Sequence, residues 1–217
     1  TFPESDSASI LLDGFNEGSM VKIIPAERKV IGYCRNNSGG VPANFHNYFV
    51  ALFDREFNTV STWHGDTIDL NDPEAEGEHA GAVLGFKTRK GDKITVKVAS
   101  SFISPEQALL NLTRETGDKD FETVKREGKE SWNRQLNRIV VEGGTSDQQR
   151  TFYSCLYRMI LFPRQFFEIN AKNEIVHYSP YNGDVLSGYM YTDNGFWDTF
   201  RALFPFFTLM YPDVDSR

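Results

Sequence analysis

The sequence has little cysteine, no long apolar run and no excess of positive charge. Cys34 and Cys155 show no CxxC spacing and form no disulfide framework, so we expect two buried free thiols. No stretch reaches the ~18 consecutive apolar residues of a membrane-spanning helix, and residues 1–9 lack the charged and apolar regions of a signal peptide, which leaves the compartment open. The 30 acidic and 23 basic residues give a net charge of −7, which argues against a nucleic-acid partner.

Common motifs for nucleotide binding, serine hydrolysis and metal binding are also missing. The sequence contains no GxGxxG, P-loop or GxSxG pattern. Its four histidines are not spaced as zinc ligands are: His46, His64, His79 and His177. Acids gather at residues 66–78 without the spacing and glycine of a calcium-binding hand. We therefore expect a solvated acidic loop there.

Aromatic residues are abundant. Among 217 residues there are 18 Phe, 9 Tyr and 3 Trp, a share that needs a large interior. The length predicts one or two globular domains at roughly 150 residues each. The composition is thus that of a folded protein.

Up to about residue 103 the pattern favours an antiparallel β structure. Three apolar runs have the length of strands: residues 20–24, 29–34 and 48–53. Apolar and polar residues alternate over 94–98, as in a strand with one wet face. Residues 61–80 carry Asp72-Pro73 and most of the clustered acids, which predicts a long loop.

After residue 103 the pattern becomes helical. Ser104-Pro105 predicts the start of a first helix. A second helix is expected over 119–139, with a stop at Gly143-Gly144. Thr145 predicts the start of a third helix, which ends before Pro163. Two extended pieces are expected at 166–169 and 175–178. A last helix is predicted from Asp193 to Tyr211, kinked at Pro205.

The last predicted helix is apolar almost all round, and such a helix is normally buried. Only residues 212–217 follow it, so we expect this chain to be part of a longer protein. In isolation, its bare apolar surface predicts self-association of the chain through this helix, or disorder of the helix.

The stretch GYMYTDNGFWDTFR at residues 188–201 is the densest in amphipathic aromatic and hydrogen-bonding side chains. Sugar sites are built in this way, because a pyranose offers apolar C–H faces to an indole and vicinal hydroxyls to a carboxylate. Adjacent Trp197 and Asp198 at a helix start meet both needs.

A structural alternative for the same stretch stays open at this point. In it, Asp193 or Asn194 caps the helix, Trp197 lies in the core, and Asp198 pairs with Arg201 three residues on. Composition does not decide between the two interpretations.

The order of motifs along the chain adds information: YFVALFD at 48–54, FYSCLY at 152–157 with LFPR at 161–164, HYSPY at 177–181, and GYMYTDNGFWDTFR at 188–201. This series closely resembles the glycoside hydrolase family ninety-two α-mannosidases. The opening TFPESDSASILL looks like the interior of that family's N-terminal β-sandwich domain, so the resemblance extends over nearly the whole chain.

The resemblance implies an α+β multidomain fold. It maps residues 1–103 onto the later part of an antiparallel β-sandwich (a supersandwich), 104–144 onto a helical linker, and 145–217 onto the first helices of an (α/α)6 barrel. The changes of pattern described above fall at the same places.

The resemblance also implies an activity: an exo-acting, calcium-dependent, inverting α-mannosidase that trims mannose from glycans of N-glycan type, in the periplasm or outside the cell. In that family the catalytic acid, the base and the calcium ligands come from later in the barrel. We therefore expect no catalytic or metal-binding residue here and no hydrolase activity of this chain alone. Glu168, Glu174 and Asp184 match no catalytic position of the family.

For substrate binding, the resemblance places Trp197 and Asp198 in the mannose subsite. The family's N-terminal domain also lends the pocket an aromatic side chain from a loop. In this sequence, the loop at 36–46 with Gly39-Gly40 offers Phe45.

A second hypothesis comes from a different class: a non-catalytic carbohydrate-binding or structural β-sandwich module with helical appendages. The gene beyond Arg217 separates the two. Several hundred further residues with paired helices and acids favour the enzyme, and a nearby stop codon favours the module.

Overall fold

The computed structural model describes residues 1–70 and 72–212, and it divides the chain into two compact units. Thr1–Asp118 and Glu168–Leu186 form the first, here called the sandwich unit. Lys119–Phe167 and the described residues from Ser187 onward form the second, here called the helical unit. Over the described part of the chain, no helix combines the length and apolar character needed to cross a membrane.

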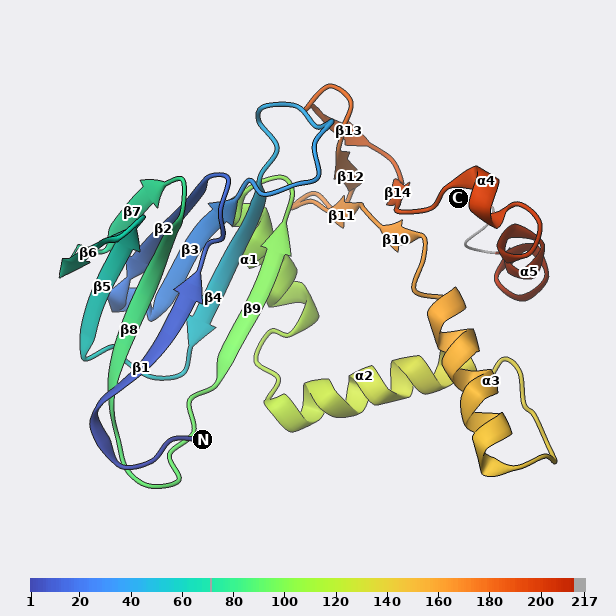
Figure 1. Ribbon diagram of the computed structural model, residues 1–217, viewed down its shortest axis with the longest axis horizontal. Helices are drawn as coiled ribbons and strands as arrows, with labels where there is room; N and C mark the ends of the chain where they lie inside the picture. Colours follow the sequence, from blue (N-terminus) through green and yellow to red (C-terminus); the bar gives the residue numbers. More distant parts are fainter. Residues whose placement is uncertain (71, 213–217) are drawn as a thin grey trace. The chain divides into compact units, whose positions relative to one another are not determined.

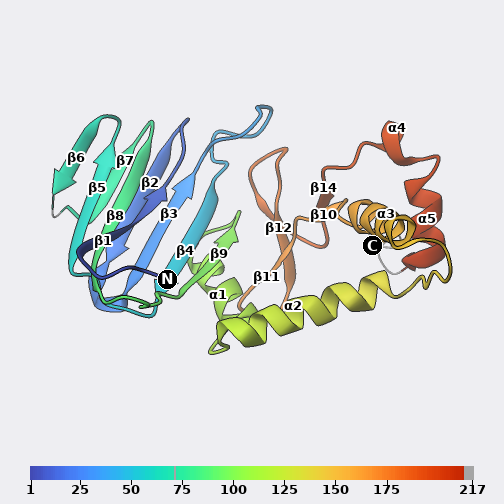
Figure 2. The same ribbon diagram turned by 60° about the horizontal axis from the view of Figure 1, so that its bottom comes forward.

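The sandwich unit is built on two antiparallel sheets, which lie face to face (Figure 1, Figure 2). The four-stranded sheet has the order β1 (Ser5–Asp13), β8 (Ala80–Thr88), β5 (Thr59–His64) and β6 (Thr67–Leu70). The five-stranded sheet has the order β7 (Glu74–Gly77), β2 (Ser19–Ile24), β3 (Lys29–Cys34), β4 (Asn47–Phe53) and β9 (Val96–Ser101). A single 3₁₀ turn at Pro25–Glu27 joins β2 to β3.

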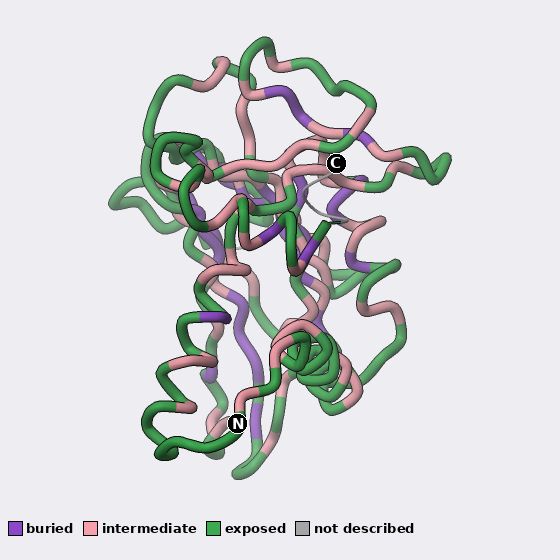
Figure 3. The backbone as a smooth tube through the Cα atoms, turned by 90° about the vertical axis from the view of Figure 1, so that its right-hand side faces the viewer, coloured by how far each residue is buried: buried purple, intermediate pink, exposed green. Residues whose placement is uncertain are grey.

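The core lies between these sheets and follows the two-residue period of the strands. Val21 and Val30 from the five-stranded sheet meet Leu84 and Phe86 from the four-stranded sheet, all at 0–1% exposure. Burying each such side chain contributes about 1.5–3 kcal/mol. Figure 3 shows long buried stretches of backbone, and the strand residues account for most of them.

Helix α1 (Pro105–Glu115) covers the other face of the five-stranded sheet, where Ala108 and Leu112 contact Val50. The Oγ of Ser104 accepts a hydrogen bond from the Gln107 N–H at 3.1 Å, which caps the first turn. The predicted helix start at Ser104-Pro105 is therefore confirmed.

A three-stranded sheet completes the sandwich unit, in the order β11 (Glu168–Ile169), β12 (Ile175–Tyr178) and β13 (Val185–Ser187). The extended piece expected at 175–178 is confirmed. The piece expected at 166–169 is a strand only over its last two residues.

The helical unit contains α2 (Phe121–Leu136), α3 (Ser146–Met159), α4 (Phe196–Thr199) and α5 (Leu203–Met210), with a short pair of strands, β10 (Arg164–Gln165) and β14 (Tyr191–Thr192). The capping box predicted at the start of α3 is present, because Thr145 and Gln148 bond reciprocally to each other's backbone. Leu156 is the only buried residue of α2 and α3.

The long loop predicted for residues 61–80 is wrong, since β5, β6 and β7 occupy most of it. Acids are unfavourable in strands, but cross-strand partners offset this here. Glu74 stands opposite Lys22 and binds its Nζ at 2.7 Å, and Glu76 accepts a hydrogen bond from the Tyr33 hydroxyl at 2.5 Å.

Three further predictions need correction. The second helix ends at Leu136, before its predicted end at 139 and well before the two glycines. The last helix is two helices, broken at residues 200–202, and Pro205 lies in the first turn of α5, where a missing N–H is tolerated. Cys34 is half-buried, but Cys155 is exposed on α3, so the second is not the buried thiol expected.

Candidate functional site

The first half of the 188–201 motif is fixed by strand pairing. Tyr191 stands opposite Gln165 in the β10–β14 pair, and the Phe166 N–H donates to the Met190 carbonyl at 2.8 Å. Asp193 then leaves the strand with a left-handed φ of 64°, and its Oδ2 accepts from Arg164 Nε at 2.5 Å. These contacts therefore fix the backbone that leads into α4.

Helix α4 follows at once, with Gly195 as its N-cap. The Asp198 N–H and the Thr199 hydroxyl both donate to the Gly195 carbonyl, at 3.1 and 2.7 Å. A Cβ on residue 195 would lie 2.6 Å from Asp198 Oδ2. The glycine thus leaves room for the Asp198 carboxylate beside the helix start.

The two faces of α4 differ in what they offer. The ring of Phe196 lies 5.8 Å from Phe200 and 5.9 Å from Phe204, which forms one apolar side. Trp197 and Asp198 follow at 100° steps around the helix. Trp197 is 81% exposed and Asp198 is also exposed. An indole and a carboxylate are thus adjacent and accessible in this unit.

The structural alternative for this motif is not realised in three respects. The start of α4 has no side-chain cap, so neither Asp193 nor Asn194 serves as one. Trp197 is not in a core. Across the described residues, no ion pair joins Asp198 to Arg201, whose guanidinium lies over the Phe200 ring at 5.1 Å instead. The role of Trp197 and Asp198 in sugar binding stays a prediction.

Phe45, the third expected site residue, lies in the sandwich unit. Its half-buried ring is 5.5 Å from Phe102 and 5.8 Å from Tyr178. Next to it, the amide of Asn44 bonds to Tyr178 and to Gly183, a contact that sequence reasoning missed. No local pattern signals it, because the partners are 134 and 139 residues away. The role of Phe45 in sugar binding also stays a prediction.

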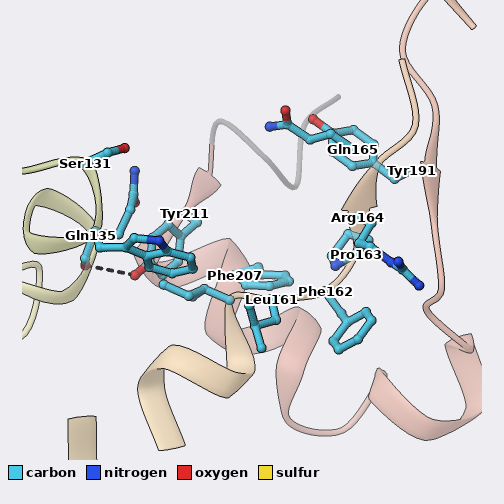
Figure 4. A pocket seen from close by; sticks show the side chains of 12 residues that line it. Ser131, Gln135, Leu161, Phe162, Pro163, Arg164, Gln165, Tyr191, Phe207 and Tyr211 are labelled. Atoms are coloured by element: carbon cyan, nitrogen blue, oxygen red, sulfur yellow. Dashed lines mark hydrogen bonds between the residues drawn. The ribbon is translucent and has the colours of Figure 1, made fainter. Parts of the chain in front are cut away.

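A pocket of about 440 Å3 lies within the helical unit (Figure 4). Its walls come from α2, the segment after α3, β14 and the end of α5, and they include Trp132, Arg164, Tyr191 and Tyr211. Among the described residues, no carboxylate lines it, and neither Trp197 nor Asp198 does.

The contacts of Tyr211 explain how one wall of this pocket is held. Its hydroxyl donates to the Gln135 carbonyl at 3.2 Å, and Arg138 lies over its ring at 4.3 Å. Burial raises the pKa of the Tyr211 hydroxyl, with a smaller opposing effect from Arg138. Tyr211 therefore ties the end of α5 to α2 and is a structural residue.

Two polar atoms of the motif are buried and have no hydrogen-bond partner among the described residues: the Tyr191 hydroxyl and the Asn194 amide nitrogen. Leaving a buried donor unpaired costs about 1–3 kcal/mol, so such groups need an explanation beyond packing. Both belong to the stretch that carries Trp197 and Asp198.

Three further carboxylates, all in the sandwich unit, are held by hydrogen bonds. Glu168 accepts from the Ser101 hydroxyl, the Phe102 N–H and the Asn111 amide. Glu174 accepts from Asn170, and Asp184 from Asn182. Within residues 1–70 and 72–212, no group of three or more His, Cys, Asp or Glu could hold a metal ion.

Comparison with known proteins identifies a family and several solved structures that resemble this chain. Residues 1–101 match the glycosyl hydrolase family 92 N-terminal domain and residues 107–217 the family 92 catalytic domain. The chain is 48% identical to the structure of a family GH92 inverting mannosidase from Bacteroides thetaiotaomicron VPI-5482, with a TM-score of 0.95 over 99% of this chain and 29% of that one. A family GH92 α-mannosidase from the same species, in complex with mannoimidazole, is 25% identical with a TM-score of 0.82, over 95% of this chain and 28% of that one.

A protein from Arthroderma benhamiae, named an uncharacterized secreted glycosidase, is 33% identical over 93 residues, which are 40% of this chain and 12% of its own length. This chain therefore spans less than a third of each of these relatives. Its antiparallel sheets followed by helices match the N-terminal β-sandwich of the family and the start of its helical domain. With both family domains matched and the whole fold reproduced, the chain belongs to glycosyl hydrolase family 92.

Proposed function

We propose that the protein containing this chain is an exo-acting α-mannosidase that trims terminal mannose from glycans. The observation that carries this proposal is the 48% identity to an inverting mannosidase over 99% of the chain. The mannoimidazole complex of a more distant relative adds support, because it places a mannose-like ligand in a protein of the same fold.

Trp197 and Asp198 are the substrate-binding residues proposed for this chain. The indole of Trp197 packs beside the apolar face of the sugar, and the Asp198 carboxylate accepts hydrogen bonds from two hydroxyls. The exposure of both groups on α4 supports this role, and so do the unpaired polar atoms of Tyr191 and Asn194 in the same motif. Phe45 contributes an aromatic contact from the N-terminal domain.

The hydrolytic step itself is assigned to residues outside this chain. Inversion requires an acid and a base about 6.5–9.5 Å apart, so that water fits between the base and the sugar. Glu168, Glu174 and Asp184 are held by hydrogen bonds within the sandwich unit and are not proposed for this role. We therefore propose that this chain alone is inactive, although it contributes to the mannose subsite.

Calcium dependence and an extracytoplasmic location complete the proposal. The family resemblance supports the calcium requirement, and the ligands of the ion are assigned to residues outside this chain. The secreted relative supports a location in the periplasm or outside the cell. Cell fractionation tests the second point directly.

The test is mannose release by the intact protein. Purified protein is incubated with α-1,2-, α-1,3- and α-1,6-linked mannosides, with calcium, with a chelator, and with calcium added back. We expect calcium-dependent release of single mannose units. Proton NMR should show the β-anomer first, as inversion at an α-linkage requires.

Three outcomes would contradict the proposed activity, its calcium dependence or its inverting stereochemistry. No release from any α-mannoside overturns it and leaves the carbohydrate-binding module as the better hypothesis. Release without calcium removes the metal requirement. An α-anomer as the first product removes inversion.

A further inference from the structure

Residues 168–186 belong by sequence to the family 92 catalytic domain, yet they fold onto the sandwich unit. This segment, here called the docked hairpin, contains β11, β12 and most of β13. It leaves the helical unit after Phe167 and returns to it at Ser187. Residues 168–186 therefore attach the catalytic-domain part of the chain to the N-terminal domain, within one compact unit.

The base of the docked hairpin is held by charged and amide side chains. The Glu168 carboxylate accepts from the Phe102 N–H at 2.9 Å and from Asn111 Nδ2 at 2.6 Å. Arg114 on α1 donates to the Ile169 carbonyl, to the Asn170 carbonyl at 2.9 Å and to Asn173. Hydrogen bonds to charged groups are stronger than neutral ones, so this end is firmly attached.

At the far end of the docked hairpin, the side chain of Asn44 makes two hydrogen bonds. Its Nδ2 donates to the Gly183 carbonyl at 2.9 Å, and its Oδ1 accepts from the Tyr178 hydroxyl at 3.1 Å. The Tyr178 side chain is 4% exposed. The Asn44 amide therefore serves as donor and acceptor at once, which an ionised carboxylate or an apolar side chain cannot do.

Gly183 shows how close this approach is. Its φ is +79°, and a Cβ built there would lie 2.3 Å from Asn44 Oδ1. Any other residue at this position would push the Asn44 amide away as well as strain the backbone. The contact between Asn44 and Gly183 thus depends on the amide side chain on the loop and on a glycine on the hairpin.

Phe45 follows Asn44 directly in the chain, and its ring contacts Phe102 and Tyr178. The rest of the loop at 36–46 is largely exposed and makes mostly local bonds, such as Asn37 to the Arg35 carbonyl and to the Gly39 N–H. The Asn44 amide is therefore one of the contacts that hold Phe45 in place, beside the His46 ring, which packs on Tyr33 and Tyr48.

We propose that Asn44 is a positioning residue that locks the loop at 36–46, with Phe45, onto the docked hairpin of the catalytic domain. This rests on the proposed function for its kinetic consequence, since Phe45 there contacts the glycan. The lock itself is a physical property of the sandwich unit and is measurable without any activity.

Three variants break the lock by different routes. Asn44→Ala removes both hydrogen bonds. Asn44→Asp keeps the size but replaces the donor with an oxygen that faces the Gly183 carbonyl. Gly183→Ala removes no hydrogen-bonding group and acts by crowding the Asn44 amide and by straining the backbone at a φ of +79°. Asn47→Ala is the matched control, because Asn47 is an exposed asparagine on β4 that makes no bond to the hairpin.

Each variant is made in the intact protein and studied by hydrogen exchange and by kinetics. We expect amide exchange at 36–46 and at 179–184 to accelerate by about fivefold to thirtyfold, the equivalent of one or two hydrogen bonds. KM for an α-mannoside should rise by about the same factor with kcat nearly unchanged, because binding and not chemistry is affected. Asn47→Ala should change neither.

Unchanged exchange at 36–46 in all three variants overturns the lock. Accelerated exchange with an unchanged KM overturns the positioning role. A fall in kcat with KM unchanged also overturns it, since that pattern belongs to the chemical step. If the wild-type protein releases no mannose, the proposed function fails, while the exchange data still decide whether Asn44 locks the loop.

Discussion

The sandwich unit and the helical unit bury their apolar side chains to very different degrees. In the sandwich unit, Val21 and Leu84 are 0% exposed within a continuous core between two sheets. In the described part of the helical unit, buried side chains are few, while Trp197 is 81% and Leu209 78% exposed. The sandwich unit is thus stabilised by its own core, whereas the helical unit leaves large apolar and aromatic groups exposed.

The largest stability effect is expected in the sandwich core. Leu84→Ala should lower the free energy of unfolding by about 2–5 kcal/mol, because a cavity adds to the lost transfer energy. Leu209→Ala in the helical unit should change it by no more than ~0.5 kcal/mol, since that side chain is exposed. Urea unfolding of both variants measures the contrast. Equal losses would show that the two units are not organised differently.

A smaller loss is expected where the docked hairpin joins the sandwich. Glu168→Gln replaces an acceptor of three hydrogen bonds with a group that also carries an N–H donor. We expect a loss of about 1.5–3 kcal/mol. Glu174→Gln, on the same hairpin, loses only an exposed bond to Asn170 and serves as control. A loss in the control as large as in Glu168→Gln would contradict the attachment described here.

Acid should weaken the sandwich unit by a smaller amount. The Phe15 N–H, and then His79, lower the pKa of Asp13, and the Arg89 N–H, and then Arg55, lower the pKa of Asp92. Carboxyls with lowered folded-state pKa values stabilise the fold above about pH 4 and lose this contribution as the pH falls through the folded pKa. Thermal scans between pH 6 and 2 should show a flatter decline for Asp92→Asn. If the thermal midpoint falls with pH in the same way in wild type and in Asp92→Asn, Asp92 makes no such contribution to stability.

The smallest effect is expected in self-association of the isolated chain. Phe196 is 73% exposed beside Trp197, and Leu209 adds apolar surface on α5. Such surface favours weak association, visible as a rise in apparent mass with concentration in sedimentation experiments. Leu209→Ser should reduce the rise. A strictly monomeric wild-type chain would contradict the prediction.

Local signals explain what the sequence predicted well. Ser104 and Thr145 cap their helices through residues three positions away, and strand-length apolar runs mark β2, β3 and β4. The Trp197-Asp198 pair stands out for a similar reason, since motif and chemistry coincide within one short stretch, and its role in sugar binding stays a prediction. Each of these predictions uses only residues that lie close together in the sequence.

Long-range contacts explain what the sequence did not predict. The acidic strand β7 forms because Glu74 meets Lys22, 52 residues away, and this overrides a poor strand propensity. The lock at Asn44 needs Tyr178 and Gly183, which no window of sequence brings together. The break between α4 and α5 likewise carries no proline or glycine at 200–202.

The most direct test of the account is kcat/KM for mannose release by the intact Asp198→Ala protein, with Arg201→Ala as the matched control on the same turn. Two charged hydrogen bonds to sugar hydroxyls, at ~1.5–3 kcal/mol each, predict a loss of at least about a hundredfold with the thermal midpoint unchanged. Arg201→Ala should have a much smaller effect. An Asp198→Ala protein within about threefold of wild type would contradict the assignment of Asp198 to the mannose subsite.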